Sequence, residues 1–344
     1  MKNNKGIIDL FCGCGGLSYG FEKAGFEIEL AIDSWKDAVE TYNHNHLKKV
    51  AKCIDIHELS NNFLEKIKKN IIGIIGGPPC QGFSTVGSRN INDSRNHLYL
   101  EYCRVVEIVK PEFFIIENVK GLLTLGNGIF KNDIINRFSK LGYKVEFKIL
   151  NAADYGIPQN RHRVFFVGLR NKKFVFPDIS EKKISSSDAI SDLPSLKYEN
   201  KTKYISDSMN EYQKEMRGKN IEILNHEKTN HIQQTVDIIK MIPDGGKITD
   251  LSKEYWNIRK YNKAFQRMNS NKPSNTIDTG HRNYFHYKYD RIPTVRESAR
   301  IQSFPDNFEF LGSKTSQYKQ VGNAVPPKLS YIIAKKIRDM LKED

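Results

Sequence analysis

The sequence has no long apolar run. A membrane-spanning helix needs about 18 or more consecutive apolar residues, but the most apolar candidate, residues 108–119, is interrupted by Lys110, Pro111, Glu112 and Glu117. The first residues, MKNNKGIIDLF, include two lysines but no apolar signal-peptide region and no cleavage site. We therefore expect a globular protein of the cytoplasm that does not contact a membrane.

Cysteine is scarce and confined to the first third of the chain. An odd number of cysteines without regular spacing excludes a disulfide framework, and no Cys/His pair lies at the spacing of a zinc tetrad. We therefore predict no bound metal. The five cysteines are Cys12, Cys14, Cys53, Cys80 and Cys103.

Acidic residues are outnumbered, and the formal net charge is +14. Such an excess favours a polyanionic partner such as nucleic acid, although a biased genome composition can produce it too. Residues 255–277 contain five cations and no acid, which taken alone indicates a solvated surface stretch. These cations are Arg259, Lys260, Lys263, Arg267 and Lys272.

The first 170 residues alternate short β-branched or aromatic runs with helical patterns. This alternation is typical of a parallel sheet flanked by helices, so we predict an open α/β domain of Rossmann-like type. The expected strands are Ile7–Phe11, Ile28–Asp33, Ile71–Gly76, Phe113–Glu117, Tyr143–Leu150 and Arg163–Leu169. The expected helices are Leu17–Ala24, Trp35–His44, Leu59–Lys69, Leu98–Val109 and Asp133–Leu141.

The periodicity fades from about Lys172, where the composition shifts to Ser, Asn, Lys and Tyr. This change predicts a second, smaller, largely irregular or β domain. A last helix, Pro327–Leu341, has the apolar spacing of an element that packs on a sheet. We therefore expect the C-terminus to return to the first domain.

A glycine-rich segment, residues 9–16, lies where the first strand gives way to a helix. Glycines there allow a tight turn and close approach to a ligand. The dinucleotide fingerprint would require glycine or alanine at Ser18, which disfavours a nicotinamide cofactor. Asp33, at the end of the second strand, suits either ribose binding or a helix N-cap. Asp55, after the probable third strand, could face an adenine amine, but a loop or cap role fits it better.

Three polar groups are expected at the edge of the sheet where its strands end. The prolines of residues 76–84 force an abrupt exit from the sheet and present Cys80, as a nucleophile or equally as a small buried residue. Glu117 ends an apolar strand, where an unpaired carboxyl group is costly and functional sites are common. Arg161 and Arg163 precede another strand and either face this edge or form a surface charge pair.

Six motifs occur in the order found in one enzyme family. They are DLFCGCGG at 9–16, GGPPCQGFS at 76–84, ENV at 117–119, QNRHR at 159–163, RESARIQSFPDNF at 296–308 and QVGNAVPP at 320–327. On these motifs the chain is identified as a member of the DNA (cytosine-5) methyltransferases. The resemblance implies S-adenosylmethionine as cofactor, S-adenosylhomocysteine as product, no metal, and methylation of C5 in a flipped-out cytosine of a specific double-stranded DNA sequence.

The resemblance also implies a role for each motif. Cys80 would attack the cytosine ring, Glu117 would hold its N3 and amine edge, and Arg161 and Arg163 would help to hold the base and the nucleophile loop. Here Ser34 stands between the ribose acid and Trp35, so which of the two covers the adenine stays open, and Ala324 offers no hydroxyl. The implied cofactor-binding residues are Phe11, Gly13, Cys14, Gly15, Gly16, Asp33, Ser34, Trp35, Asp55, Ile56, Pro79, Leu98, Asn323 and Ala324.

The resemblance divides the chain into a catalytic domain (1–178), a target-recognition domain (179–292) and a hinge with the C-terminal helix (293–344). Residues 81–96 would close over the flipped base, and cations of the second domain would neutralise phosphates or read guanines. The expected DNA-contacting residues are Gln81, Ser84, Arg259, Lys260, Arg267, Thr276 and Arg282.

Other functions compete with this interpretation. A tRNA cytosine-5 methyltransferase keeps the same motifs, but the long basic variable region favours DNA. An inactive DNA-binding protein would have no use for a nucleophile opposite a carboxyl group, and a small-molecule enzyme would not need the basic second region. We expect a monomer that protects DNA from a cognate restriction endonuclease without stable association, although an orphan or phage enzyme would look the same.

Overall fold

A computed structural model describes residues 6–79, 97–180, 182–196, 203–204, 206–256, 265–279 and 284–342. Its contacts divide the chain into two compact units. Unit 1 comprises Met1–Asn151, His162–Asp178 and Leu329–Asp344, and unit 2 comprises Ala152–Arg161 and Ile179–Lys328. This division by compactness differs from the expected division by function in assigning residues 152–161 and 293–328 to unit 2.

Unit 1 is built on a seven-stranded sheet with the order β3-β2-β1-β4-β5-β8-β6. Strands β1 to β5 are parallel, but β8 runs antiparallel to both β5 and β6. The expectation of a parallel sheet is therefore wrong for β8, because hydrophobic periodicity carries no information on strand direction. The strands are β1 (Gly6–Leu10), β2 (Ile28–Asp33), β3 (Ala51–Cys53), β4 (Ile71–Gly76), β5 (Phe113–Val119), β6 (Lys144–Asn151) and β8 (His162–Leu169).

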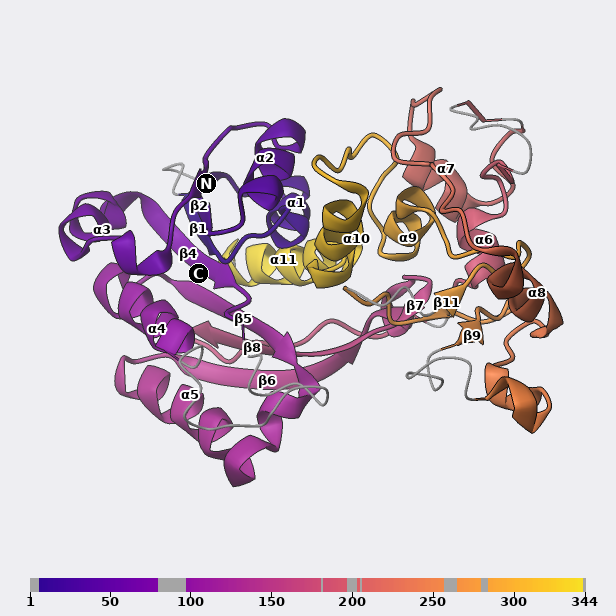
Figure 1. The fold of residues 1–344 in the computed structure, drawn as a ribbon. Helices are drawn as coiled ribbons and strands as arrows, with labels where there is room; N and C mark the ends of the chain where they lie inside the picture. The colour runs from indigo at the N-terminus through magenta and orange to yellow at the C-terminus, as the bar shows by residue number, and fades with distance from the viewer. Residues whose placement is uncertain are drawn as a thin grey trace. The chain divides into compact units, whose positions relative to one another are not determined.

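Helices cover both faces of this sheet (Figure 1). One layer holds α3, α4 and α5, whose apolar side chains join those of the strands in a single buried cluster. The opposite layer holds α1, α2 and α11. The helices are α1 (Gly16–Lys23), α2 (Lys36–Asn45), α3 (Asn61–Ile67), α4 (His97–Val109), α5 (Ile129–Lys140) and α11 (Pro327–Lys342), with 3₁₀ turns η1 (Ile56–Glu58), η2 (Lys68–Asn70), η5 (Lys120–Leu123) and η6 (Leu125–Gly128).

The C-terminal helix α11 packs on α1. The Ser330 hydroxyl donates to the Leu17 carbonyl, and Arg338 donates to the Ala24 carbonyl. Gly20 permits this approach, because a Cβ added there would lie 2.4 Å from the Tyr331 nitrogen. The end of the chain thus completes the layer that supports the first helix.

Two glycines leave room for large rings on the neighbouring strand β5. Gly73 of β4 is paired with Phe113, and Gly168 of β8 is paired with Phe114. A Cβ at Gly73 would lie 2.2 Å from Phe113 Cζ, and one at Gly168 would lie 2.1 Å from Phe114 Cε1. Both rings are fully buried, so the centre of the sheet is filled by large residues of one strand lying over glycines of its neighbours.

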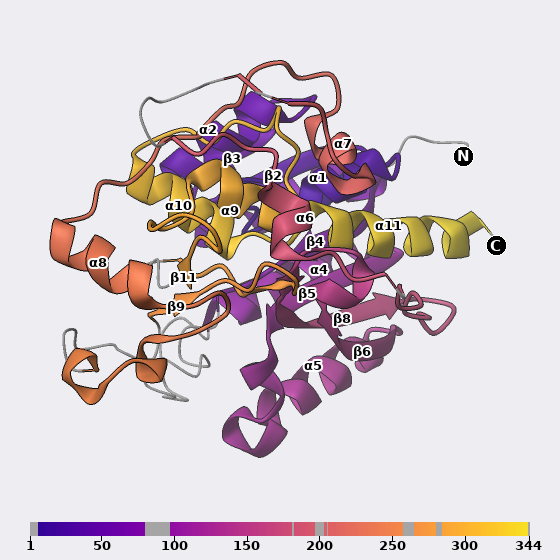
Figure 2. The same ribbon diagram turned by 90° about the vertical axis from the view of Figure 1, so that its right-hand side faces the viewer.

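Unit 2 has little regular structure. Its strands are two residues long and form the pairs β7 with β10 and β9 with β11, and α8 lies beside β9 and β11 (Figure 2). The elements are β7 (Gln159–Asn160), β9 (Gln266–Arg267), β10 (Ser274–Asn275), β11 (Tyr284–Phe285), α6 (Ser186–Ile190), α7 (Glu211–Arg217), α8 (Gln233–Met241), α9 (Val295–Ile301) and α10 (Lys314–Asn323), with η7 (Ala152–Tyr155), η8 (Ile248–Asp250) and η9 (Lys253–Tyr255).

Buried ion pairs hold this irregular chain together. Arg300 donates to Asp192 at 2.8 Å and to Asp306 at 2.6 Å, and all three side chains are fully buried. Arg291 donates to both carboxylate oxygens of Glu297 at 2.7 Å. Burial alone would raise the pKa of Glu297, but the Arg291 guanidinium outweighs it and holds that pKa well below its usual range. Motif 296–308 therefore forms a charged core for unit 2.

Within the described part of the chain, no helix combines the length and the apolar character needed to cross a membrane.

Candidate functional site

The glycine-rich segment forms a tight connection between β1 and α1. Phe11, Gly13 and Gly15 have φ angles of 60°, 54° and 92°, a region that favours glycine. The Cys12 amide donates to the Ile32 carbonyl at 3.0 Å, and the Gly15 amide donates to the Cys12 carbonyl at 2.9 Å. The loop is therefore anchored to β2 and to itself, and it leads directly into the first turn of α1, which begins at Gly16.

Asp33 holds this glycine loop from the end of β2. One carboxylate oxygen accepts from the Gly13 amide at 2.9 Å, and the other accepts from the Trp35 amide at 2.8 Å. A Cβ added at Gly13 would meet no atom of the described residues within 4 Å, so among these residues the loop backbone faces open space beside a fixed carboxylate. These residues fit a ligand with hydroxyl donors for the acid and a polar chain for the loop, as S-adenosylmethionine has.

Asp55, between β3 and η1, acts as a cap. Its carboxylate accepts from the His57 amide at 2.9 Å and also contacts the His57 ring, and these contacts lower the pKa of Asp55. The next residue, Ile56, is buried. The cap explanation considered for Asp55 is therefore realised, and its exposed carboxylate remains charged and able to accept a further hydrogen bond.

The remaining cofactor candidates of unit 1 differ in exposure. Trp35 is half-buried whereas Ser34 is exposed, so the indole offers the larger apolar surface beside Asp33. Leu98 on α4 packs partly against the core of the sheet. Burial raises the pKa of the Cys14 thiol to about 12, so this side chain is a neutral packing group. Gly16 begins α1, and Pro79 is half-buried after β4.

The exits of β4 and β5 bring the second set of candidates together. The Glu117 carboxylate is 9% exposed and lies 3.1 Å from the Arg163 Nε on β8. Gly77 lies against the same carboxylate, since a Cβ there would be 3.1 Å from Glu117 Oε2. The Asn118 amide donates to the Pro78 carbonyl at 3.0 Å. The segment that leads into Cys80 is thus fixed beside Glu117.

Tyr102 of α4 supports this arrangement through contacts with β4 and β5. Its buried hydroxyl lies 3.1 Å from the Ile74 carbonyl of β4 and 2.7 Å from the Ile115 carbonyl of β5, and can donate to either. It therefore links the two strands whose ends carry the predicted catalytic groups.

Several predicted site residues lie outside the described residues. They are Cys80, Gln81, Ser84, Arg259, Lys260 and Arg282.

In unit 2, Arg161 connects two of the sequence motifs. Its side chain is 1% exposed, and its Nη2 donates to the Gly322 carbonyl at 2.9 Å. Gly322 precedes Asn323, which ends α10 with an exposed side chain, and the Ala324 carbonyl accepts from the Gln302 amide at 2.6 Å. Arg161 therefore fixes the turn that presents Asn323.

Arg267 is not placed to read DNA. Its guanidinium is buried and donates to two carbonyls at the end of α8, those of Ile239 and Ile242. It also donates to the His286 carbonyl and to the Asp290 carboxylate. The prediction that it contacts a base is therefore corrected, because the protein itself uses its donors. The Thr276 hydroxyl, another expected DNA contact, donates to the Asn160 carbonyl at 2.7 Å and so ties Thr276 to β7.

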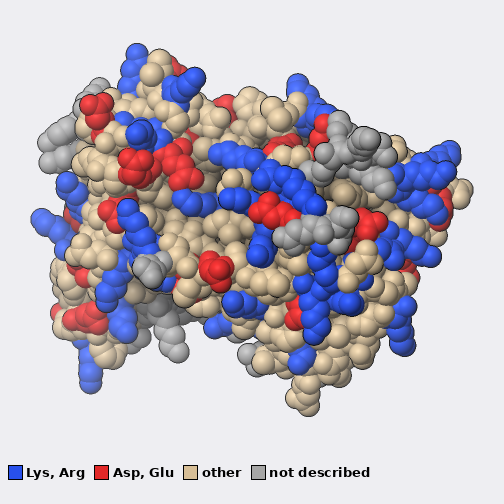
Figure 3. Space-filling view, turned by 180° about the vertical axis from the view of Figure 1, so that it is seen from behind, with Lys and Arg blue, Asp and Glu red and all other residues tan. Residues whose placement is uncertain are grey.

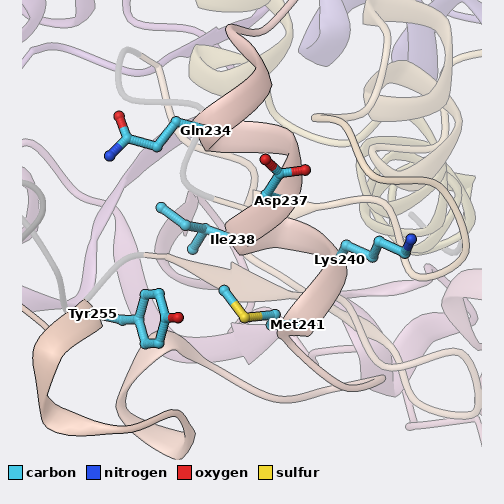
Figure 4. Close-up of a pocket in the computed structure, with 6 residues that line it drawn as sticks. All are labelled: Gln234, Asp237, Ile238, Lys240, Met241 and Tyr255. Atoms are coloured by element: carbon cyan, nitrogen blue, oxygen red, sulfur yellow. The ribbon is translucent and has the colours of Figure 1, made fainter.

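A surface pocket of about 480 Å³ lies in unit 2 between α8 and η9 (Figure 4). Its lining combines the apolar surfaces of Ile238, Met241 and Tyr255 with polar side chains of Gln234, Asp237 and Lys240. None of these six residues was predicted from the sequence as a site residue. On the face shown in Figure 3, acidic side chains lie between the Lys and Arg side chains.

Sequence reasoning overlooked two residues at the exits of β4 and β5. Asn118 stands inside a motif that was used only for Glu117, so it could have been noticed. Tyr102 has no local signal, because its partners, the Ile74 and Ile115 carbonyls, lie on two other elements.

The strand order with its antiparallel β8, the glycine loop and the acid after β2 define a Rossmann-like methyltransferase fold. The family model of C-5 cytosine-specific DNA methylases matches residues 6–339, and the chain belongs to this family. Its methyl donor is therefore S-adenosylmethionine.

Relatives support this assignment. The Type II methyltransferase M1.HphI of Haemophilus parahaemolyticus is 39% identical over 97% of this chain and 86% of its own length. M.DdeI of Desulfomicrobium norvegicum, another Type II methyltransferase, is 38% identical over 96% of this chain and 88% of its own length. A solved structure described as a putative DNA modification methyltransferase of an E. coli prophage has 28% identity and a TM-score of 0.82, covering 98% of this chain and 99% of that one.

Proposed function

We propose that this enzyme methylates C5 of a flipped-out cytosine within a specific double-stranded DNA sequence, through a covalent bond between Cys80 and C6 of the ring. The observation that carries the proposal is the Glu117 carboxylate, held by Arg163 at 3.1 Å beside the segment that leads into Cys80. A carboxyl group so placed can steady a pyrimidine while the thiol attacks it.

The chemistry requires both groups, because C5 of cytosine is a poor nucleophile. The Cys80 thiolate adds to C6, and Glu117 contacts the amine and supplies a proton or hydrogen bond at N3, so that charge on the ring is neutralised. Bound S-adenosylmethionine supplies the electrophilic methyl group that C5 takes up. A base such as water then takes the C5 proton, and the electron pair of that C–H bond forms the C5–C6 double bond. The Cys80 thiolate leaves C6, and the aromatic ring is restored.

Asp33 would hold the ribose, Asp55 the adenine amine and the glycine loop the methionine end of the cofactor. Trp35 is the better candidate to cover the adenine, since it is half-buried whereas Ser34 is exposed. We also propose that Asn323, in the turn of unit 2 that Arg161 fixes, contacts the cofactor. These assignments require no metal.

Extruding the base costs a few kcal/mol, which contacts with DNA must offset. We assign this task to residues 179–292 and to the loop 81–96. The proposed role is modification within a restriction–modification system of the prokaryotic cytoplasm, by a monomer that shares a sequence with its endonuclease but does not bind it stably.

Trapping on DNA that contains 5-fluorocytosine tests the covalent step. The wild-type protein with S-adenosylmethionine should form an adduct that survives denaturation, and Cys80→Ala should bind the duplex without forming it. Failure of the folded, DNA-binding wild-type protein to form the adduct on its own target site would reject the mechanism. Bisulfite sequencing of DNA from cells that express the protein supplies that target site.

A further inference from the structure

His46, at the C-terminal end of α2, fills the space behind the glycine loop. Its side chain is fully buried, although the residues that follow it, Leu47 to Lys49, are exposed. No motif includes it, and the proposed chemistry does not use it. A buried imidazole that touches a predicted cofactor loop calls for a physical explanation.

The imidazole occupies the place where Gly15 lacks a side chain. A Cβ at Gly15 would lie 2.0 Å from His46 Nε2 and 2.8 Å from Tyr42 Cδ2. Gly15 has a φ of 92°, so both its backbone conformation and its neighbour exclude a larger residue. The loop backbone therefore rests directly on the edge of the His46 ring.

Three contacts fix the orientation of that ring. Glu22 of α1 lies 2.7 Å from Nδ1, and since a carboxylate only accepts, Nδ1 carries the proton. The ring stacks on Tyr42 with centroids 3.8 Å apart and planes at 11°, and Tyr19 meets it edge-on at 6.0 Å. Glu22 is itself only 13% exposed, so water weakens this pair little.

The glycine loop is thus held from two sides. Asp33 accepts from the Gly13 amide on the side that faces open space, and His46 supports Gly15 from behind. Removing one support would leave the loop to be ordered when a ligand binds, and the lost conformational entropy would weaken that binding.

From this geometry we propose that His46, oriented by Glu22, is a positioning residue that sets the affinity for S-adenosylmethionine by keeping the glycine loop in its binding conformation. The inference rests on the proposed cofactor role of this loop. It assigns the pair to binding and not to methyl transfer, because neither residue reaches the open side of the loop.

The test measures the Kd of S-adenosylmethionine and of S-adenosylhomocysteine by calorimetry, and hydrogen exchange of the amides of residues 12–16 without ligand. His46→Ala and Glu22→Ala should each raise both Kd values about tenfold and speed exchange in the loop. The value of kcat at saturating cofactor should stay within about twofold of wild type. His44→Ala is the matched control, since His44 lies on the same helix with an exposed side chain.

The outcomes separate the two proposals. If the wild-type protein binds neither compound, the proposed cofactor site is wrong. If the wild-type protein binds and both variants match it in Kd and in loop exchange, the role of His46 is wrong. Should His46→Ala fail to fold, Glu22→Ala decides by the same measurements, and His46→Phe, which keeps a ring on Tyr42, should bind better than any His46 variant without a ring.

Discussion

The two units bury ionisable groups for different reasons. In the described part of unit 1 the buried acidic and histidine side chains are Asp9 on β1, which accepts from Ser18 of α1, His46 against the glycine loop, and Glu117 at the end of β5. In unit 2 buried arginines and acids face one another, as Arg300 faces Asp192 and Asp306. Buried charge therefore indicates a functional site in unit 1 and architecture in unit 2.

The cause lies in the regularity of the two regions. Long strands pair their backbone groups with one another and leave an apolar interior. A charged group buried there costs free energy, so it is expected where a function requires it. The two-residue strands of unit 2 leave many carbonyl groups without ladder partners. Arg267 and Arg296 donate to such carbonyls, and acids then balance their charge.

Replacing Glu117 by Gln should give the largest effect. The variant keeps the shape of the side chain but cannot supply a proton to the ring, so kcat should fall by about 10²–10⁴ while the midpoint of thermal unfolding changes little. Methyl-transfer kinetics and calorimetry measure the two quantities. Glu112→Gln, at an exposed position next to the same strand, should leave both unchanged. A large loss of stability in Glu117→Gln would contradict a purely functional role.

Replacing Arg300 by Met should destabilise unit 2 by about 3–5 kcal/mol, because Asp192 and Asp306 would then be buried without their main partner. Urea unfolding, combined with limited proteolysis to locate the change, measures it. The control is Lys214→Ala, which removes an exposed pair with Glu211 and should have no measurable effect. Equal stabilities of the Arg300 variant and wild type would show that apolar packing alone supports unit 2.

Replacing Asp9 by Asn should change how stability depends on pH. Burial raises the pKa of Asp9 from 3.8 to about 7, so between these values the native state holds a proton that the unfolded chain has lost. Stability from this group is therefore present at low pH and falls as the pH rises through that window, by up to about 1.4 kcal/mol per pH unit. Urea titrations from pH 4 to 7 should show a shallower decline in the variant. Identical slopes would mean that Asp9 is ionised throughout.

The smallest expected effect is on the salt dependence of DNA binding, which distinguishes Arg267 from a cation that contacts DNA. Arg267→Met should lower stability and leave the salt dependence of DNA binding unchanged, whereas Arg259→Ala should reduce the slope of log K against log salt by about one. Fluorescence anisotropy at several salt concentrations measures both slopes. A reduced slope for the Arg267 variant would restore it to the DNA interface.

The sequence predicts unit 1 well because hydrophobic period and glycine position are local signals. The bounds expected for β2 and β4 agree with the structure, and those for β1, α4 and α11 differ by one residue or so. The direction of β8 could not be predicted, since it depends on pairing with β5. For unit 2 the sequence predicted only its irregularity. Its contacts could not be predicted, because they include ion pairs such as Arg300 with Asp192, whose members are 108 residues apart.

The same distinction applies to the site. Glu117 and Arg163 belong to motifs, and the structure brings them together. Arg267 was misassigned because residues 255–277 contain no acid, whereas its partner Asp290 lies outside that range. His46 gave no signal at all, since its importance comes from Gly15, which lies 31 residues earlier. Family motifs thus identify the groups that would touch substrate and cofactor, but not the side chains that hold them in place.

The glycines paired with rings at the centre of the sheet restrict how this protein can change over evolutionary time. A side chain at Gly73 or Gly168 would collide with Phe113 or Phe114, and a smaller residue in place of either ring would leave a cavity. Neither the glycine nor the phenylalanine of a pair can be replaced without a change in the other. Substitutions there should arise as compensated pairs across neighbouring strands, so in distant descendants bulk gained on β4 or β8 should be matched by bulk lost on β5.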